Sequence, residues 1–160
     1  MKLKGFVEED FVQYKKPSMF LGTTKCNWKC CTELGLCTDI CQNSPLASSK
    51  TIVVDDEDIY KRFTENPITK AVVIGGLEPM LDIDDVIHLI STFRANGCDC
   101  DFVIYTGYYK DEIKSQLEKL LKFSNIIVKF GRYIPNKNSI YDSVLGVRLA
   151  SDNQYAERLS

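Results

Sequence analysis

The chain has 160 residues, of which 44% are hydrophobic and 26% are charged, so it is long and apolar enough to bury the core of one soluble domain. Its net charge of -2 at pH 7, with lysines and arginines scattered along the sequence, argues against nucleic acid as a partner. No stretch is apolar enough for a signal peptide or a membrane span, so we expect a cytoplasmic protein that does not bind membranes.

Short apolar runs alternate along the chain with longer amphipathic segments. Runs rich in β-branched and aromatic residues predict strands at 19–23, 51–54, 71–76, 102–107 and 126–131. An acidic start before Pro67 predicts a short helix at 55–66, and an apolar period near 3.6 predicts helices at 83–97 and 111–122. This alternation predicts an α/β fold around a parallel sheet. No repeat or linker marks a domain boundary, so we expect a single domain over 1–160. Because about four such units cannot close an eight-stranded barrel, we expect its sheet to stay open.

Three unusual segments follow predicted strands. A cysteine-rich stretch at 26–41 follows the first strand, the sequence GGLEP occupies 75–79, and TGY occupies 106–108. Each glycine taken alone most simply makes a tight turn. Because the carboxyl ends of parallel strands meet at one edge of the sheet, the three segments together favour a shared site.

The cysteine-rich stretch predicts a metal site. Five of the seven cysteines lie between Cys26 and Cys41, and in a reducing compartment such a cluster is more often a metal site than a disulfide framework. Two kinds of site are compatible with the count. Cys26, Cys30, Cys37 and Cys41 could close a tetrahedral zinc site, whereas three thiolates suit a [4Fe-4S] cluster with one open iron. Glu78 favours the second, because a carboxylate has no task in a closed zinc site but can bind a cationic amino group near an open iron.

Several segments resemble a known family. The sequence CNWKC at 26–30, with a later cysteine before Gln42-Asn43, is similar to the three-cysteine loop of radical S-adenosylmethionine enzymes, and GGLEP resembles their GGEP segment. The segments VIYTGY (103–108), KFGRYI (129–134) and ASDNQYAERL (150–159) resemble the small activating enzymes of anaerobic ribonucleotide reductase. The resemblance therefore extends over nearly the whole chain.

The resemblance implies a set of ligands. Cys26, Cys30 and Cys41 would hold a [4Fe-4S] cluster, because Asn43 then stands two residues beyond the last ligand, as in the family. Ten residues separate Cys30 from Cys41 where the family has two, so the loop would contain an insertion, and Cys37 is the main rival of Cys41. Leu77 either replaces the second glycine of the family motif or is a one-residue insertion after Gly75-Gly76. The residues expected to contact S-adenosylmethionine are Asn43, Gly75, Gly76, Glu78, Thr106 and Gly107.

The resemblance also implies a fold, a reaction and partners. It implies an open partial (βα) barrel of about four to six parallel strands. The reaction would be reductive cleavage of S-adenosylmethionine to a 5′-deoxyadenosyl radical, which installs a glycyl radical on a large partner such as anaerobic ribonucleotide reductase. A flavodoxin- or ferredoxin-type protein would donate the electron. The alternative is a non-catalytic metal-binding or electron-transfer module with a four-cysteine zinc or iron-sulfur site.

Overall fold

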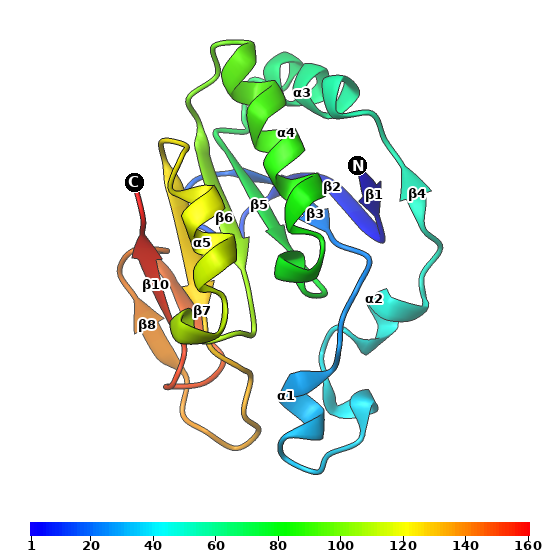
Figure 1. Ribbon diagram of the computed structural model, residues 1–160, viewed down its shortest axis with the longest axis vertical. Helices are drawn as coiled ribbons and strands as arrows, with labels where there is room; N and C mark the ends of the chain where they lie inside the picture. Colours follow the sequence, from blue (N-terminus) through cyan, green and yellow to red (C-terminus); the bar gives the residue numbers. More distant parts are fainter.

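A six-stranded β-sheet forms the centre of the molecule (Figure 1), and the computed structural model describes all residues from 1 to 160. The strands follow the order β10-β7-β6-β5-β3-β2. Within it β3, β5, β6 and β7 are parallel, and the two edge strands are antiparallel to their neighbours. The bounds are β2 Gly5–Asp10, β3 Ser18–Gly22, β5 Ala71–Gly75, β6 Asp101–Tyr105, β7 Ile126–Phe130 and β10 Tyr155–Arg158.

The four parallel strands are almost wholly apolar because both faces of the sheet are covered. Every residue of β5 and β7 is buried. One row of neighbours, formed by Leu21, Ile74, Ile104 and Val128, runs across all four strands in register. All four side chains are fully buried, and this row belongs to the main core on the sheet side.

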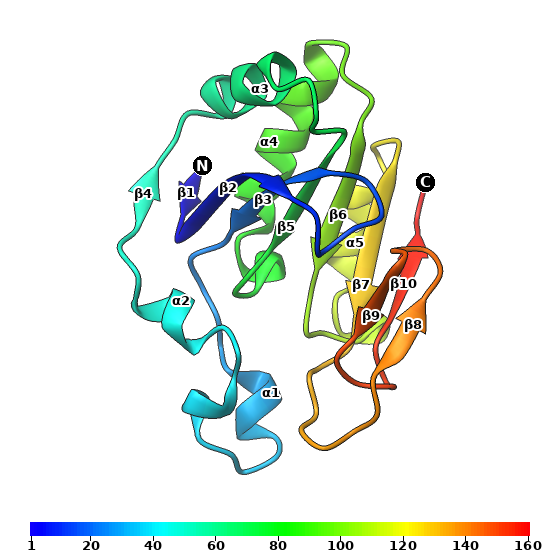
Figure 2. The same ribbon diagram turned by 180° about the vertical axis from the view of Figure 1, so that it is seen from behind.

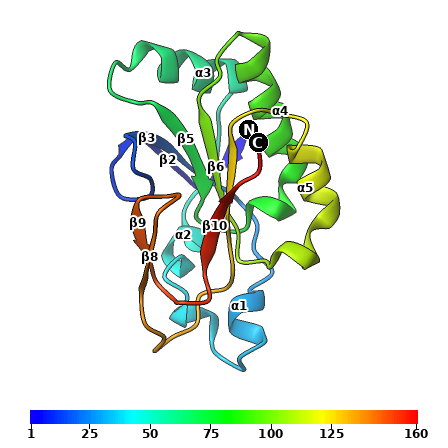
Figure 3. The same cartoon turned by 90° about the vertical axis from the view of Figure 1, so that its left-hand side faces the viewer.

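Three helices cover one face of this sheet (Figure 3). They are α3 (Asp56–Glu65), α4 (Ile83–Ala95) and α5 (Lys114–Leu120). In α4 the buried residues Val86, Leu89, Ile90 and Phe93 recur at helical spacing, which places them on one side of the helix. They join a core of 21 buried residues between the helices and the sheet.

A hairpin and a loop cover the other face (Figure 2). The hairpin consists of β8 (Ile140–Asp142) and β9 (Val147–Leu149), and the loop connects β2 to β3. A second core of eight buried residues lies here, in which Tyr14, Leu145 and Leu149 pack with Val73 and Val103 of the sheet. The strand ends between this hairpin and β3 are where the candidate site forms.

The cysteine loop, residues 23–50, leaves the end of β3 and contains little regular structure. It includes α1 (Lys29–Thr32), the 3₁₀ turn η1 (Thr38–Ile40) and α2 (Ser44–Ser48). It then leads into β4 (Ile52–Val53), which pairs with β1 (Lys2–Leu3) outside the central sheet. Two further 3₁₀ turns, η2 (Pro79–Leu81) and η3 (Lys110–Glu112), follow β5 and β6.

Most predicted elements are confirmed. The predicted strands at 19–23, 71–76, 102–107 and 126–131 are β3, β5, β6 and β7, and the three predicted helices are α3, α4 and α5 with shorter bounds. The predicted strand at 51–54 shrinks to the two residues of β4 and lies outside the sheet. The curvature of a partial barrel stays a prediction. None of the helices combines the length and the apolar character that crossing a membrane requires.

Candidate functional site

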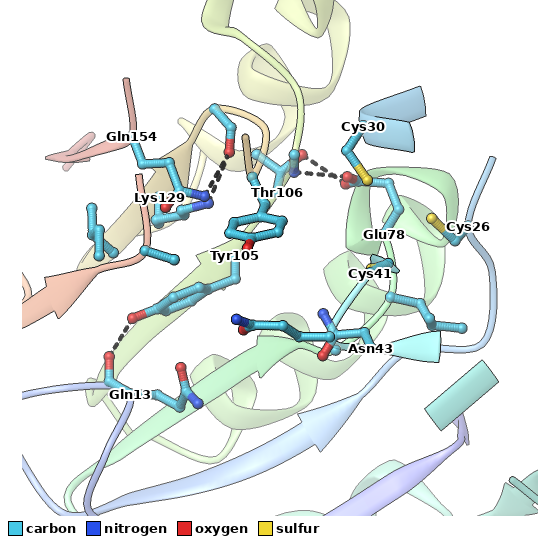
Figure 4. Close-up of a pocket in the computed structure, with 18 of the residues that line it drawn as sticks. Gln13, Cys26, Cys30, Cys41, Asn43, Glu78, Tyr105, Thr106, Lys129 and Gln154 are labelled. Atoms are coloured by element: carbon cyan, nitrogen blue, oxygen red, sulfur yellow. Dashed lines mark hydrogen bonds between the residues drawn. The ribbon is translucent and has the colours of Figure 1, made fainter. Parts of the chain in front are cut away.

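A pocket of about 370 Å³ lies at the carboxyl ends of the parallel strands. Its lining includes Cys26, Cys30 and Cys41 of the cysteine loop and Glu78 of the segment after β5. Figure 4 shows the thiols and Glu78 at one end of the pocket and Lys129 at the other. The three segments that were predicted to share a site therefore contribute to one cavity.

The cysteine loop begins with an unusual backbone turn. Trp28 adopts a left-handed conformation, with φ of 58°, and this residue precedes the first turn of α1. The turn lets the backbone N–H of Trp28 donate to Cys26 Sγ at 3.3 Å. Cys30 then follows on α1, one turn further along the chain. Local geometry thus brings the first two thiols to the same side of the loop, facing the pocket.

The third thiol of the pocket comes from the end of η1. Cys41 lies beside the Cys30 thiol, and its carbonyl oxygen accepts from the Ser44 backbone N–H at 3.0 Å. The interaction with the Cys30 thiol is the main reason that the pKa of Cys41 is lowered to about 6, and the same interaction raises the pKa of Cys30. Burial raises the pKa of Cys26. Cys26, Cys30 and Cys41 are therefore the thiols that line this pocket.

The two remaining cysteines of the loop lie outside this pocket. Cys37 is exposed to solvent. Cys31 is buried, with 3% of its surface accessible, and the Cys31 sulfur lies 3.9 Å from the Cys30 sulfur. None of the seven cysteines forms a disulfide. No three histidine, cysteine or acidic side chains converge on a point that one metal ion could occupy.

Glu78 is a buried carboxylate held by three hydrogen bonds. Its side chain follows β5 and is 6% exposed. Oε1 accepts from the Thr106 hydroxyl at 2.7 Å and from the Met80 backbone N–H at 3.1 Å, and Oε2 accepts from the Gly107 N–H at 2.9 Å. Burial raises the pKa of Glu78, against the effect of these bonds. The end of β6 therefore orients the carboxylate, and Thr106 and Gly107 line the pocket beside it.

The two glycines after β5 have different positions. Gly76 lines the pocket and has φ of 79°, and a Cβ atom there would lie 2.4 Å from Leu46 Cδ2. Only glycine satisfies both the backbone conformation and the close approach of α2. Gly75 is the last residue of β5 and does not line the pocket, and its carbonyl oxygen accepts from the Thr23 N–H at 2.9 Å. Asn43 lines the pocket and is exposed to solvent.

The far end of the pocket holds a buried cation that the sequence analysis missed. Lys129 of β7 is 7% exposed, and its Nζ donates to the Gly131 carbonyl oxygen at 2.8 Å. Burial lowers the pKa of this lysine to about 8, although Glu78 and Cys30 favour its charged form. The signal in the sequence was a single charged residue inside the apolar run IIVKF.

Two further polar side chains lie near Lys129. Gln154 is buried and donates from Nε2 to the same Gly131 carbonyl at 3.2 Å. The Tyr105 hydroxyl donates to the Gln13 carbonyl oxygen in the loop between β2 and β3. Both side chains line the pocket, and both belong to segments that carry the resemblance, VIYTGY and ASDNQYAERL.

One comparison with known proteins matches most of the chain. A family model described as a 4Fe-4S single cluster domain matches residues 18–155. No curated protein and no solved structure matches the chain. The matched span begins with β3 and ends in β10, so it contains the cysteine loop and every strand that contributes to the pocket.

Proposed function

Because the chain belongs to the family of 4Fe-4S single cluster domains, we propose that Cys26, Cys30 and Cys41 hold a [4Fe-4S] cluster. The observation that supports this assignment is that these three thiols, and not Cys37, line one pocket together with a buried carboxylate. The ligands of such a cluster bind different irons, so they need not converge on one point as zinc ligands do. Three thiolates leave the fourth iron free for a substrate.

We propose that the substrate is S-adenosylmethionine. Glu78 supports this proposal because a carboxylate has about four acceptor positions and three are used by Thr106, Gly107 and Met80. The remaining position can accept from the ammonium group of the substrate's methionine end. Lys129, buried at the far end of the pocket, offers a positive charge to an anionic group. The pocket thus carries a negative charge at the end where the thiols lie and a positive charge at its far end.

A reduced [4Fe-4S] cluster held there would supply the one electron that breaks the bond between the sulfonium and the adenosyl 5′ carbon, giving methionine and a 5′-deoxyadenosyl radical. That radical would take a hydrogen atom from a glycine of a partner enzyme and become 5′-deoxyadenosine. The chain's own residues bind and orient the substrate and keep water away from it. Glu78 and Lys129 are suited to these tasks because both are more than nine-tenths buried.

Anaerobic ribonucleotide reductase is the partner that we propose. The segments VIYTGY, KFGRYI and ASDNQYAERL, which resemble its activating enzymes, contribute Thr106, Lys129 and Gln154 to the same pocket. Three separate segments of one resemblance therefore meet at one site. A flavodoxin- or ferredoxin-type donor would supply the electron.

Anaerobic reconstitution with iron and sulfide tests this function. The reduced protein should convert S-adenosylmethionine to 5′-deoxyadenosine, and addition of an anaerobic ribonucleotide reductase should produce a glycyl doublet in the electron paramagnetic resonance spectrum. Cys37→Ala serves as the control that removes a thiol outside the pocket. A stable cluster that never consumes S-adenosylmethionine would contradict the proposal and support an electron-transfer module instead.

A further inference from the structure

The part of the cysteine loop that carries Cys26 and Cys30 has little apolar packing of its own. The helix α1 has four residues, of which only Cys31 is buried. Burial of a hydrophobic face therefore cannot hold this helix in place, as it holds α4. Polar contacts to the rest of the molecule must fix its position.

The strongest of these contacts is made by Arg132, which lies two residues beyond the end of β7. Its guanidinium group is bidentate to Glu112, with Nη1 to Oε2 at 2.8 Å and Nη2 to Oε1 at 2.6 Å. It also contacts Glu33 at the end of α1, with Nη2 to Oε1 at 2.9 Å and Nε to Oε2 at 2.7 Å. Arg132 is 5% exposed, and the centre of its guanidinium lies 4.8 Å from the centre of the Tyr109 ring.

Lys29 completes this group of charges. It begins α1, forms an ion pair with Glu112 and lies 3.5 Å from Glu33. We call Lys29, Glu33, Glu112 and Arg132 the clasp. With two positive and two negative side chains it is neutral as a whole, so no charge in it lacks an opposite partner.

The clasp lies next to the thiols. Arg132 and Lys29 line a small pocket of about 30 Å³ together with Cys26, Cys30 and Glu78. Three separate segments meet here, namely the cysteine loop, the turn η3 after β6 and the end of β7. The planar fork of an arginine suits this position because it can bind two carboxylates at once, which a lysine cannot do with the same geometry.

We propose that Arg132 is a positioning residue that fixes α1, and with it Cys26 and Cys30, over the ends of the parallel strands. Cys41 does not depend on it, because the far side of the loop is tied down separately. There the Ser44 hydroxyl donates to the Thr38 carbonyl oxygen at 2.6 Å, and Lys4 Nζ donates to the Ala47 carbonyl oxygen at 2.6 Å. The clasp therefore sets how far the thiols of Cys26 and Cys30 lie from the thiol of Cys41.

Hydrogen exchange in the metal-free protein tests the first half of this proposal. Six consecutive backbone N–H groups, from residue 31 to residue 36, donate hydrogen bonds within and just after α1 and report on its stability. In Arg132→Met their exchange should become faster by about tenfold or more, since bonds to a charged group are lost. Glu33→Gln should act in the same direction and leaves the Arg132–Glu112 pair intact, so it replaces Arg132→Met if that variant does not fold.

Arg158→Met is the matched control. Arg158 pairs with Asp101 at 2.9 Å at the opposite end of the sheet, so its loss should leave exchange at 31–36 unchanged. The second measurement is the rate at which a ferrous-iron chelator removes iron from the reconstituted proteins. That rate should rise about tenfold in Arg132→Met and Glu33→Gln and not in Arg158→Met.

The proposal requires both changes. Exchange at 31–36 in Glu33→Gln that matches the unmodified chain would overturn it, and so would an unchanged rate of iron loss. It rests on the assignment of the cluster to this loop and not on the radical reaction. Because the exchange measurement uses neither S-adenosylmethionine nor a partner, failure of the proposed function would leave its result intact.

Discussion

Thr106 donates its hydroxyl hydrogen to Glu78 Oε1 across 2.7 Å, which joins the end of β6 to the segment that follows β5. The Gly107 N–H completes the contact on the other carboxylate oxygen. The carboxylate is therefore fixed before any substrate arrives. A group held in this way loses little further freedom on binding, which favours affinity.

Replacing Glu78 by glutamine should weaken binding of S-adenosylmethionine without loss of the cluster. We expect the dissociation constant to rise by about tenfold to a hundredfold, in line with the roughly 1.5 to 3 kcal/mol of a hydrogen bond to a charged group. Equilibrium binding to the reconstituted protein measures this change. Glu65→Gln, which removes the same charge from an exposed position on α3, is the control. An unchanged dissociation constant in Glu78→Gln would exclude the assigned role.

Alanine substitution of each cysteine in the loop separates ligands from bystanders. Cys26→Ala, Cys30→Ala and Cys41→Ala should each lose the [4Fe-4S] cluster, measured as iron and sulfide per chain after anaerobic reconstitution. Cys37→Ala should retain it, because this side chain is exposed and lies outside the pocket. Loss of the cluster in Cys37→Ala with retention in Cys41→Ala would reverse the assignment of the third ligand.

Gly76 and Gly97 form a matched pair for testing the close approach at the pocket. Both have positive φ, 79° and 76°, but a Cβ atom at Gly76 meets Leu46 at 2.4 Å whereas one at Gly97 meets nothing within 4 Å. Gly97→Ala should therefore cost only the backbone strain of about 1 to 2 kcal/mol. Gly76→Ala should cost more and should also lower iron retention, because Leu46 belongs to α2 in the cysteine loop. Urea unfolding measures both variants. If Gly76→Ala and Gly97→Ala lose the same unfolding free energy, Leu46 moves away without cost and the prediction is wrong.

Glu112 should make the folded state sensitive to acid. The pKa of Glu112 is lowered to about 2, mainly by hydrogen bonds from Arg132, and Lys29 lowers it further. Glu33 accepts from the same guanidinium group of Arg132. A carboxyl whose folded pKa is depressed contributes stability above its unfolded pKa, and this contribution is lost as the pH falls towards the folded value. Between pH about 5 and about 2, the metal-free protein should therefore lose more unfolding free energy than Glu112→Gln does.

Urea unfolding at several pH values within this window measures the difference. Asp111→Asn, which removes a neighbouring exposed carboxylate of η3, is the control and should keep the pH dependence of the unmodified chain. Parallel curves for the unmodified chain and Glu112→Gln would contradict the prediction.

The elements that the sequence predicts are those whose stability is local or whose burial is complete. β5 and β7 are buried along their whole length, so they read as continuous apolar runs. The missed strands β2 and β10 lie at the edges of the sheet, where a strand pairs on one side only and its outer residues stay polar, as in GFVEED. Their pairing depends on a neighbour that is distant in the sequence.

The residues of the site also fall into those that a local pattern predicts and those that depend on contacts between distant segments. Cysteines and glycines after predicted strands can be recognised as site candidates from their residue type alone. The structure brings Cys26, Glu78 and Thr106 to one pocket. The partners of the cysteine loop carry no such mark. Glu33 and Arg132 are 99 residues apart, so their contact follows from the packing of the whole chain and not from any local spacing.

That separation also sets an order of events during synthesis on the ribosome. The thiols of the cysteine loop are translated well before Arg132, and at about 5 to 20 residues per second the interval is roughly 5 to 20 seconds. During that interval the loop has neither its anchoring arginine nor the strand β7 that carries Lys129. We expect iron and sulfide delivered during that interval to find a site without fixed geometry, so loading of the cluster belongs to the period after Arg132 has been translated and has packed against the cysteine loop.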